Sequence, residues 1–308
     1  MKRYPIKFAP QEKKAIWGRE IWLVSGHPSM PSVAANGIYA GRKLPDLVAD
    51  FGTELVGSAS PVGKFPLLVK VIEANDRLSV QVHSCEESAK LCGGDPKTEM
   101  WYVLESGHGA EIFAGLRHGV DRERLEKALA GDAEQAVAKF RVKRGDVLFI
   151  PGGLVHAIGG GCRVFEVQQT SDTTWRLHDW NRVDAATGQP RKLNLREGFA
   201  SIDWSLPPPE LLRDTTIGDG GTSAQELVKC DFFRFSVRDL REPVLLEGSE
   251  ESFVILHAEE GGGEVFVEGT EPVAFAAGEC VLVPAATPFE IRPKPHAHLL
   301  VAEAGRRK

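Results

Sequence analysis

Short hydrophobic runs, separated by glycine, proline and polar residues, recur along almost the whole chain. Examples are FPLLVKVIEA, LSVQVHS, WYVLE, AEIFAGL, DVLFIPGG, CRVFEVQQ, FFRFSVRDL, SFVILHA, GEVFVEG and CVLVPA. Each run has about the length of one strand, and turn-forming residues bound most of them. This pattern is typical of a barrel or sandwich of many short strands, and not of strands that alternate with helices. The sequence therefore predicts a mainly-β protein.

A few segments depart from the strand pattern. Residues 121–140, DRERLEKALAGDAEQAVAKF, combine good helix formers with a helical spacing of apolar positions, which predicts one or two short surface helices. Another short helix is predicted at SAKLCG, shortly after His83. Near the N-terminus, AIWGREIW and LPDLVADFG predict edge strands together with a short helix. All of these helices are expected to be small insertions in a β-fold.

An internal repeat gives the best evidence on architecture. GDVLFIPGGLVHAI begins at Gly145, and GECVLVPAATPFEI begins 133 positions later, at Gly278. Both copies contain a glycine, an acid, a hydrophobic strand, a proline turn and a residue that projects from the next strand. This arrangement resembles the second sequence motif of the cupins, small jelly rolls of two sheets. Two cupin-type jelly rolls are therefore predicted, residues 1–205 and 206–308, with a boundary at the proline-rich SLPPPELL.

The two copies differ at the position that matters for chemistry. The first copy has His156 where the second has Phe289, and a phenylalanine side chain cannot bind a metal ion. No pair of histidines precedes the second copy, because His257 stands alone in VILHAEEG. Metal chemistry is therefore expected in the first jelly roll, and the second is expected to be structural.

Four residues of the first jelly roll form a candidate metal site. Because side chains alternate between the faces of a strand, Gln81 and His83 point to one face and the intervening valine points to the other. A lone histidine in a hydrophobic strand is commonly a core residue, but His83 has a polar neighbour on its face. Two imidazoles, one carboxylate and one amide suit a divalent ion such as zinc. The predicted ligands are Gln81, His83, Glu99 and His156.

Other polar residues extend this candidate site. By the same alternation, Ser79 shares the face of Gln81, and Lys97 shares the face of Glu99. Glu166 lies among apolar residues of a predicted strand. It is either the partner of a buried hydrogen-bond donor or a proton-transfer group near the metal.

Two basic residues suggest an anionic substrate. Arg176, in TSDTTWRLHDWNR, either forms an ion pair with Asp172 or Asp179, or binds a phosphate or carboxylate beside the metal. Lys70 lies in the apolar strand LLVKVIEA, where an unpaired ammonium group is costly. It either serves the anion or pairs with Glu73.

Composition narrows the classes of partner. The 308 residues carry a formal net charge of −6, which does not favour nucleic acid, and their 42% apolar content is that of a soluble protein. No apolar run is long enough for a membrane span, and the N-terminus lacks the apolar stretch of a signal peptide. The five cysteines are odd in number and lack a zinc-knuckle spacing, so free thiols in the cytoplasm are expected. The oligomeric state is not predicted.

Taken together, the motifs resemble those of the type I mannose-6-phosphate isomerases in their short bacterial form. The resemblance extends over WGREIW, FPLLVKVIEANDRLSVQVHS, KTEMWYVLE, RGDVLFIPGGLVHAI and TSDTTWRLHDWNR, and so over most of the first two hundred residues. It implies one zinc ion per chain, held by the four predicted ligands. It also implies an active-site arginine at Arg176 and a substrate pocket lined by Ser79, Lys97, Lys70 and Glu166.

The same resemblance implies a reaction, the interconversion of mannose 6-phosphate and fructose 6-phosphate through a cis-enediol. Arg176 would stabilise the enediolate or hold the phosphate, and the base would be Glu166, Lys97 or a hydroxide on the metal. Two alternatives are a cupin oxygenase, because two histidines and a glutamate also suit non-haem iron, and a non-catalytic sugar-phosphate sensor. Gln81 and Arg176 argue against the oxygenase, and the intact ligand set argues against the sensor.

Overall fold

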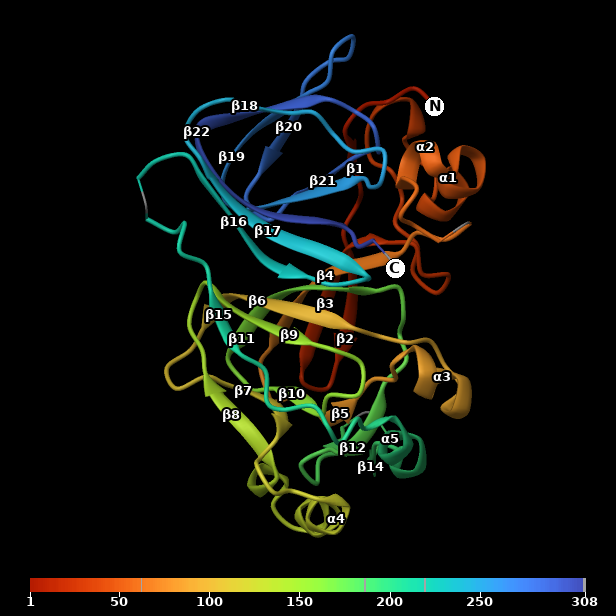
Figure 1. Cartoon of the computed structure of the whole chain (residues 1–308), viewed down its shortest axis with the longest axis vertical. Coiled ribbons are helices and arrows are strands. Elements are labelled where there is room, and N and C mark those ends of the chain that lie inside the picture. The colour runs from red at the N-terminus through yellow and green to blue at the C-terminus, as the bar shows by residue number, and fades with distance from the viewer. Residues whose placement is uncertain (62, 186, 219, 307–308) are drawn as a thin grey trace. The chain divides into compact units, whose positions relative to one another are not determined.

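The computed structural model of the chain describes residues 1–61, 63–185, 187–218 and 220–306 (Figure 1). The chain forms two compact units, and both are discontinuous in sequence. The first unit consists of Met1–Gln11, Trp22–Lys70 and Arg213–Lys308, and the second of Glu12–Ile21 and Val71–Leu212. The mainly-β prediction is confirmed, because strands form the framework of both units.

The division of the chain differs from the simple boundary expected at residues 205 and 206. The difference arises at the N-terminus, where β1 (Ile6–Lys7) pairs with β21 (Cys280–Val283) and so joins the C-terminal sheet. On the C-terminal side, the second unit ends at Leu212, close to the proline-rich segment. That residues 1–205 and 206–308 are separate domains stays a prediction.

Most of the second unit is built on two sheets (Figure 1). In order, the five-stranded sheet contains β12 (Trp175–His178), β5 (Val80–Val82), β10 (His156–Ile158), β7 (Glu111–Leu116) and β8 (Val137–Arg141). The seven-stranded sheet contains β15 (Leu211–Arg213), β9 (Asp146–Ile150), β6 (Glu99–Ser106), β11 (Cys162–Gln169), β4 (Leu67–Ala74), β3 (Gly18–Ser25) and β2 (Gln11–Ala15). A two-stranded ribbon follows β12 and consists of β13 (Val183–Asp184) and β14 (Gln189–Pro190).

Hydrophobic side chains cover both faces of the five-stranded sheet. Its inner face shares a buried cluster with the seven-stranded sheet, for example through Ile112, Ile158 and Trp101. Its outer face packs Val80 and Val82 in a second cluster, which is completed by α4 (Arg122–Ala130), α5 (Leu195–Ser201) and neighbouring residues. The strand alternation predicted for residues 80–83 is thus present, with the valines turned outward.

The helical predictions are largely confirmed. Helix α4 begins after Asp121, whose Oδ1 accepts a hydrogen bond from the Arg124 amide, and η2 (Ala133–Gln135) follows it. The last part of the predicted helical segment is a correction, because residues 137–140 belong to strand β8, which pairs with β7. Helix α3 (Glu86–Cys92) covers the predicted SAKLCG. The N-terminal helices are η1 (Gly37–Tyr39), α1 (Leu44–Phe51) and α2 (Thr53–Val56).

The first unit is built on one eight-stranded sheet that folds over on itself. Its main path is β1, β21, β19 (Val254–Phe266), β22 (Phe289–Ala304), β17 (Phe233–Leu240) and β16 (Ser223–Lys229), with β18 (Val244–Leu246) and β20 (Val273–Ala276) added at its side. Strand β19 bends at two irregularities between Ala258 and Gly263. A Cβ on Gly263 would lie 2.3 Å from the Arg292 carbonyl oxygen, so the close approach of β22 requires glycine there.

The internal repeat corresponds to the same local structure in each unit. Gly145 and Gly278 both have left-handed backbones, with φ of 84° and 86°, which explains why glycine recurs at this turn. His156 then begins β10, and Phe289 begins β22. Phe289 is buried in the hydrophobic core of the first unit. Phe289 therefore has the structural role that the sequence predicts for the second copy of the repeat.

The described cysteines form no disulfide, and all five are free thiols. Among the described helices, none has the length and apolar character that a membrane span requires. The free thiols agree with the expectation from the number and spacing of the cysteines.

A buried histidine links three segments of the first unit. His298 Nε2 lies 3.0 Å from Asp214 Oδ2, and His298 Nδ1 lies 3.2 Å from Glu259 Oε2. Burial by itself lowers the pKa of His298, but the two carboxylates outweigh that effect and raise it to about 9. The imidazolium is therefore the stable form in the folded protein at neutral pH.

We expect this network to make stability depend on pH. Because the folded pKa of His298 is raised, its contribution is complete below the unfolded value near 6.5 and is lost as pH rises through about 9. The free energy of unfolding should fall by roughly 3 kcal/mol over that interval, measured by urea denaturation with circular dichroism. In His298→Gln this slope should disappear; an equal slope in both proteins would contradict the assignment.

Candidate metal centre

One cross-strand row of the five-stranded sheet carries three of the predicted site residues. Gln81 on β5 lies opposite His156 on β10 and opposite Arg176 on β12, in two antiparallel pairs. Residues directly opposite in antiparallel pairs have side chains on the same face. His83 follows Gln81 by two positions and so shares this face. The row therefore brings the two imidazoles, the amide and the guanidinium to one side of the sheet.

The facing sheet supplies the carboxylates. Glu99 begins β6, and Glu166 lies on β11, where Gln168 pairs with Glu99 and Glu166 pairs with Trp101. Glu99 and Glu166 are about 1% exposed, so both are held away from water. Nitrogen ligands from one sheet and oxygen ligands from the other thus meet in the interior of the second unit.

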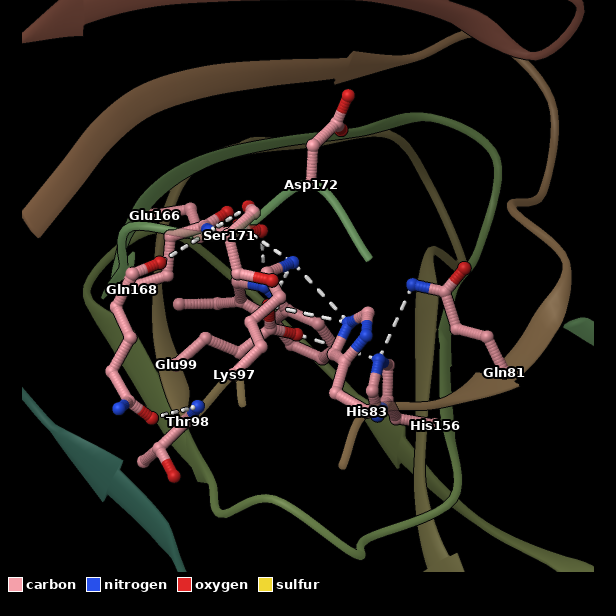
Figure 2. Close-up of polar contacts among 12 residues, drawn as sticks. Gln81, His83, Lys97, Thr98, Glu99, His156, Glu166, Gln168, Ser171 and Asp172 are labelled. Carbon is pink, nitrogen blue, oxygen red and sulfur yellow. Dashed lines mark hydrogen bonds and ion pairs between the residues drawn. The ribbon is translucent and has the colours of Figure 1, made fainter. Parts of the chain in front are cut away.

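His83, Glu99 and His156 form a compact group, with one donor atom of each within 4.8 Å of the other two. Glu99 Oε2 lies 3.5 Å from His83 Nε2, and Glu99 Oε1 lies 3.4 Å from His156 Nε2. Figure 2 shows the imidazoles and the Gln81 amide on one side, with Glu99 and Lys97 opposite. Among the described residues, this group meets the geometry that three or more His, Cys, Asp and Glu side chains need to bind a metal ion.

Both imidazoles are oriented by backbone carbonyl groups. His83 Nδ1 donates to the Thr173 carbonyl at 3.0 Å, and His156 Nδ1 donates to the Leu154 carbonyl at 2.8 Å. Since a carbonyl oxygen only accepts, each Nδ1 carries a proton, and in the neutral ring Nε2 then presents its lone pair to the group. Burial, assisted by nearby Lys97, lowers the pKa of His156 to about 4. His156 is therefore neutral at physiological pH, as a metal ligand must be.

The donor set fits a divalent metal ion. Two neutral imidazole nitrogens and a carboxylate are ligands that zinc and similar borderline ions accept. Gln81 is close but presents its amide nitrogen, which lies 3.3 Å from His156 Nε2, while its oxygen accepts from Ser79 Oγ at 3.2 Å. To become the fourth ligand, Gln81 has to rotate its amide so that the oxygen faces the group.

Lys97 joins the metal group to Glu166. Its Nζ lies 2.5 Å from Glu99 Oε2, 3.2 Å from His83 Nε2 and 3.3 Å from Glu166 Oε1. Glu166 Oε2 accepts a hydrogen bond from Trp101 Nε1 at 2.9 Å. Glu166 is thus the partner of a buried donor, as one of its two interpretations proposed, and it also lies within reach of the Lys97 ammonium.

Arg176 does not form either of the ion pairs considered for it. Asp172 pairs with Lys13 at 2.8 Å, and Asp179 pairs with two other arginines. The Arg176 guanidinium donates from Nη1 to the Lys192 carbonyl at 2.9 Å, and no carboxylate pairs with it among the described residues. Burial, and then the nearby guanidinium of Arg191, lower its pKa. This half-buried positive charge is suited to an anion.

Lys70 is buried on β4, at the last residue of the first unit before the chain enters the second. The alternative partner Glu73 lies 2.5 Å from Arg19 and 3.5 Å from Arg163. A role for Lys70 in binding substrate stays a prediction.

Sequence reasoning missed the groups that orient the ligands. The carbonyls of Leu154 and Thr173 leave no signal in the sequence, because any residue supplies one. The bond from Trp101 to Glu166 was missed as well, because it depends on the pairing of β6 with β11. The pairing of Asp179 with arginines was also missed, since Asp179 had been considered only as a partner of Arg176.

The fold and the site define a cupin-type β-sandwich with a buried His–Glu–His group, and comparisons with known proteins specify the family. Residues 6–112 match the family described as phosphomannose isomerase type I, catalytic domain. The chain is 33% identical over 299 residues to a mannose-6-phosphate isomerase of Streptococcus mutans, which covers 91% of this chain and 92% of the relative. This chain therefore belongs to the type I phosphomannose isomerase family.

Further similarities agree with this membership. Mannose-6-phosphate isomerase ManA of Bacillus subtilis is 32% identical over 299 residues, with 91% of this chain and 93% of the relative covered. The crystal structure of the mannose 6-phosphate isomerase from Bacillus subtilis superimposes with a TM-score of 0.85 at 27% identity, over 97% of this chain and 99% of that one. A variant of the Salmonella typhimurium phosphomannose isomerase, with a TM-score of 0.75 and 15% identity, shares the fold over 98% of this chain and 99% of that one.

We expect His156→Ala to lose bound metal, because the change removes one of two buried imidazole donors. Metal content after loading with zinc, measured by plasma emission spectroscopy, should fall from one equivalent to well below that. A matched control is His118→Ala, which removes an exposed histidine outside the group. Full metal content in folded His156→Ala protein would rule out this site.

Proposed function

We propose that this chain interconverts mannose 6-phosphate and fructose 6-phosphate in a zinc-dependent reaction. The observation that carries the proposal is the shared row of His156, Gln81 and Arg176, which aligns a metal group with a cationic side chain that pairs with no described carboxylate. A metal beside an anion-binding arginine suits a phosphorylated sugar whose reacting carbons lie at the metal. Membership of the family supports the same activity.

The proposed reaction moves protons and breaks no carbon–carbon bond. A base removes the proton on C2 of the open-chain aldose. The electron pair of the broken C–H bond forms the double bond of a cis-enediol, and the C1 oxygen gains a proton. A proton then returns to C1 while the C2 hydroxyl loses its proton and becomes the ketone. Charge on the two oxygens is the main obstacle, and fixed positive groups lower that barrier.

His83, Glu99, His156 and a rotated Gln81 would hold the zinc ion. When bound, zinc supplies Lewis-acid stabilisation of the oxygens on C1 and C2. The amide of Gln81 is neutral, so it would leave more positive charge at the centre than another carboxylate would. Ser79 would fix the rotated amide, since its hydroxyl can also accept a hydrogen bond.

Glu166 is our candidate for the proton-transfer group. Its bonds to Trp101 and Lys97 favour the carboxylate form, which can accept a proton. Lys97 contacts both Glu166 and Glu99, so its ammonium can donate a proton to a substrate oxygen and hold the substrate at the metal group. Lys97, Ser79 and Lys70 are the proposed substrate-binding residues.

We expect zinc-loaded protein to form fructose 6-phosphate from mannose 6-phosphate. A coupled assay measures the product, and chelation followed by the addition of zinc should abolish and then restore it. Oxygen uptake serves as the control for the alternative reaction of a cupin oxygenase. If fully metal-loaded protein turns over no aldose phosphate, the isomerase proposal fails.

Arg176→Ala should keep its metal and lose turnover. Removal of a well-placed electrostatic group lowers the rate on the order of 10²- to 10³-fold, while the His83, Glu99 and His156 donors are untouched. The assay is the same coupled reaction on protein of measured zinc content. Arg42→Ala is the control, because Arg42 forms a surface pair with Asp50. Wild-type turnover in Arg176→Ala would remove this residue from the mechanism.

A further inference from the structure

Two arginines meet on one buried carboxylate in the second unit. The Asp179 side chain is 6% exposed and accepts hydrogen bonds from Arg182 Nη2 at 2.6 Å and from Arg191 Nε and Nη2 at 2.8 and 2.5 Å. Burial would raise the pKa of Asp179, but the two guanidinium groups lower it, so Asp179 is a carboxylate. These contacts fix the positions of both arginines.

The two arginines differ in the donors that remain. Arg182 also bonds Asp76 Oδ2 at 3.1 Å and the Arg77 carbonyl at 2.6 Å through Nη1, and its Nε bonds the Asp179 carbonyl at 3.3 Å. Arg191 uses only one edge of its guanidinium, and no described residue accepts a bond from its Nη1. Its side chain is 18% exposed. Arg182 is thus saturated by the protein, whereas Arg191 presents an open edge.

Arg176 also has an unused donor. Its Nε is buried and has no hydrogen-bond partner among the described residues. Its Nη1 donates to the carbonyl of Lys192, the residue after Arg191, and the Arg191 guanidinium lowers the pKa of Arg176. Repulsion between the two guanidinium groups and the buried Nε of Arg176 without an acceptor are both unfavourable, and a bound anion relieves the first and supplies the second. A phosphate, with its several acceptor oxygens, suits such a pair.

The backbone that carries this cluster is strained. Trp180 and Asn181 both have a left-handed φ of 56°, which is costly for residues with a side chain. Trp180 Nε1 donates to the Leu78 carbonyl at 2.6 Å, and Arg77 lies over the Trp180 ring, 4.4 Å from its centroid. The turn therefore persists because its neighbours hold it. Strain of this kind is found where a side chain has to be aimed at a ligand.

The pairing of strands in the five-stranded sheet shows where Arg176 and the segment that carries Arg191 lie relative to the metal site. Arg176 lies two strands from His156, or about 10 Å at ~4.8 Å per strand. The segment after Arg191 lies beyond β12, since the Asn194 amide donates to the Arg176 carbonyl at 2.7 Å. The order is therefore metal group, Arg176 and then the segment that carries Arg191. An open-chain hexose phosphate can span this distance with its reacting carbons at the metal.

We propose that Arg191 binds the phosphate group of an open-chain sugar phosphate, with Arg176 between that phosphate and the metal group. Asp179 is a positioning residue that holds Arg191, and Arg182 supports Asp179 without touching substrate. This assignment rests on the proposed function for the identity of the sugar, but the binding of phosphate can be measured without turnover.

The test compares Arg191→Gln with Arg182→Gln. Each change removes a guanidinium from Asp179, but only the first removes an open donor. In Arg191→Gln, the KM for mannose 6-phosphate and the Kd for inorganic phosphate, by calorimetry, should both rise on the order of 10- to 100-fold. Its metal content should stay near the wild-type value, because Arg191 does not belong to the metal group. In Arg182→Gln, KM and Kd should stay within about twofold of wild type, since the control removes no group that contacts substrate.

Unchanged KM and Kd in folded Arg191→Gln would overturn the proposal, as would equal changes in Arg182→Gln. If Arg191→Gln does not fold, Arg191→Lys replaces it. Lysine keeps a positive charge beside Asp179 but lacks the second donor edge of the guanidinium. A smaller rise in KM and Kd is then expected, and no rise overturns the assignment. Phosphate binding that depends on Arg191 in a protein without isomerase activity would refute the proposed function and uphold the anion site.

Discussion

The site depends on donors that come from two facing sheets. The imidazoles lie at β10 and just past β5, and the carboxylates lie on β6 and β11. Glu99 is almost fully buried, and a buried carboxylate requires nearby positive charge or strong hydrogen bonds. Lys97 provides an ammonium at 2.5 Å, and the neutral imidazole of His156 adds no competing charge. Because one sheet supplies the imidazoles and the other supplies the carboxylates and Lys97, the pairing of the two sheets determines both the donor set and the charge around it.

Strand register carries this constraint across the five-stranded sheet. A shift of β5 by one residue would turn Gln81 outward and Val80 inward, and so exchange the metal face with the face that packs against α4 and α5. The hydrophobic positions thus fix the direction in which the polar side chains point. A register shifted by one residue would turn valines toward the site and bury an amide in an apolar cluster. The same register aligns Arg176 with Gln81, so the order of the groups along the substrate is a property of the sheet.

Much of this could be predicted from the sequence, because alternation and the repeat act over short distances. His83, Glu99 and His156 were grouped correctly, since their strands were evident and cupin-type turns indicated where they meet. Longer-range features were not accessible. SFVILHA and GEVFVEG, expected as two strands, are one strand, β19, bent at a glycine-rich bulge that looks like a turn in sequence. The contact between Asp179 and Arg191 depends on a left-handed turn, which no pattern of hydrophobic positions reveals.

The two copies of the repeat show why a single ligand position does not make a site. Their turns match at Gly145 and Gly278, and His156 and Phe289 begin equivalent strands. Yet His156 lies opposite Gln81, whereas Phe289 lies opposite Leu246 on β18. A histidine in place of Phe289 would therefore face a hydrophobic core and would have no polar partner in its row. Metal chemistry in this fold requires a complete cross-strand row together with a carboxylate on the facing sheet, and only then does the repeated turn place a functional histidine.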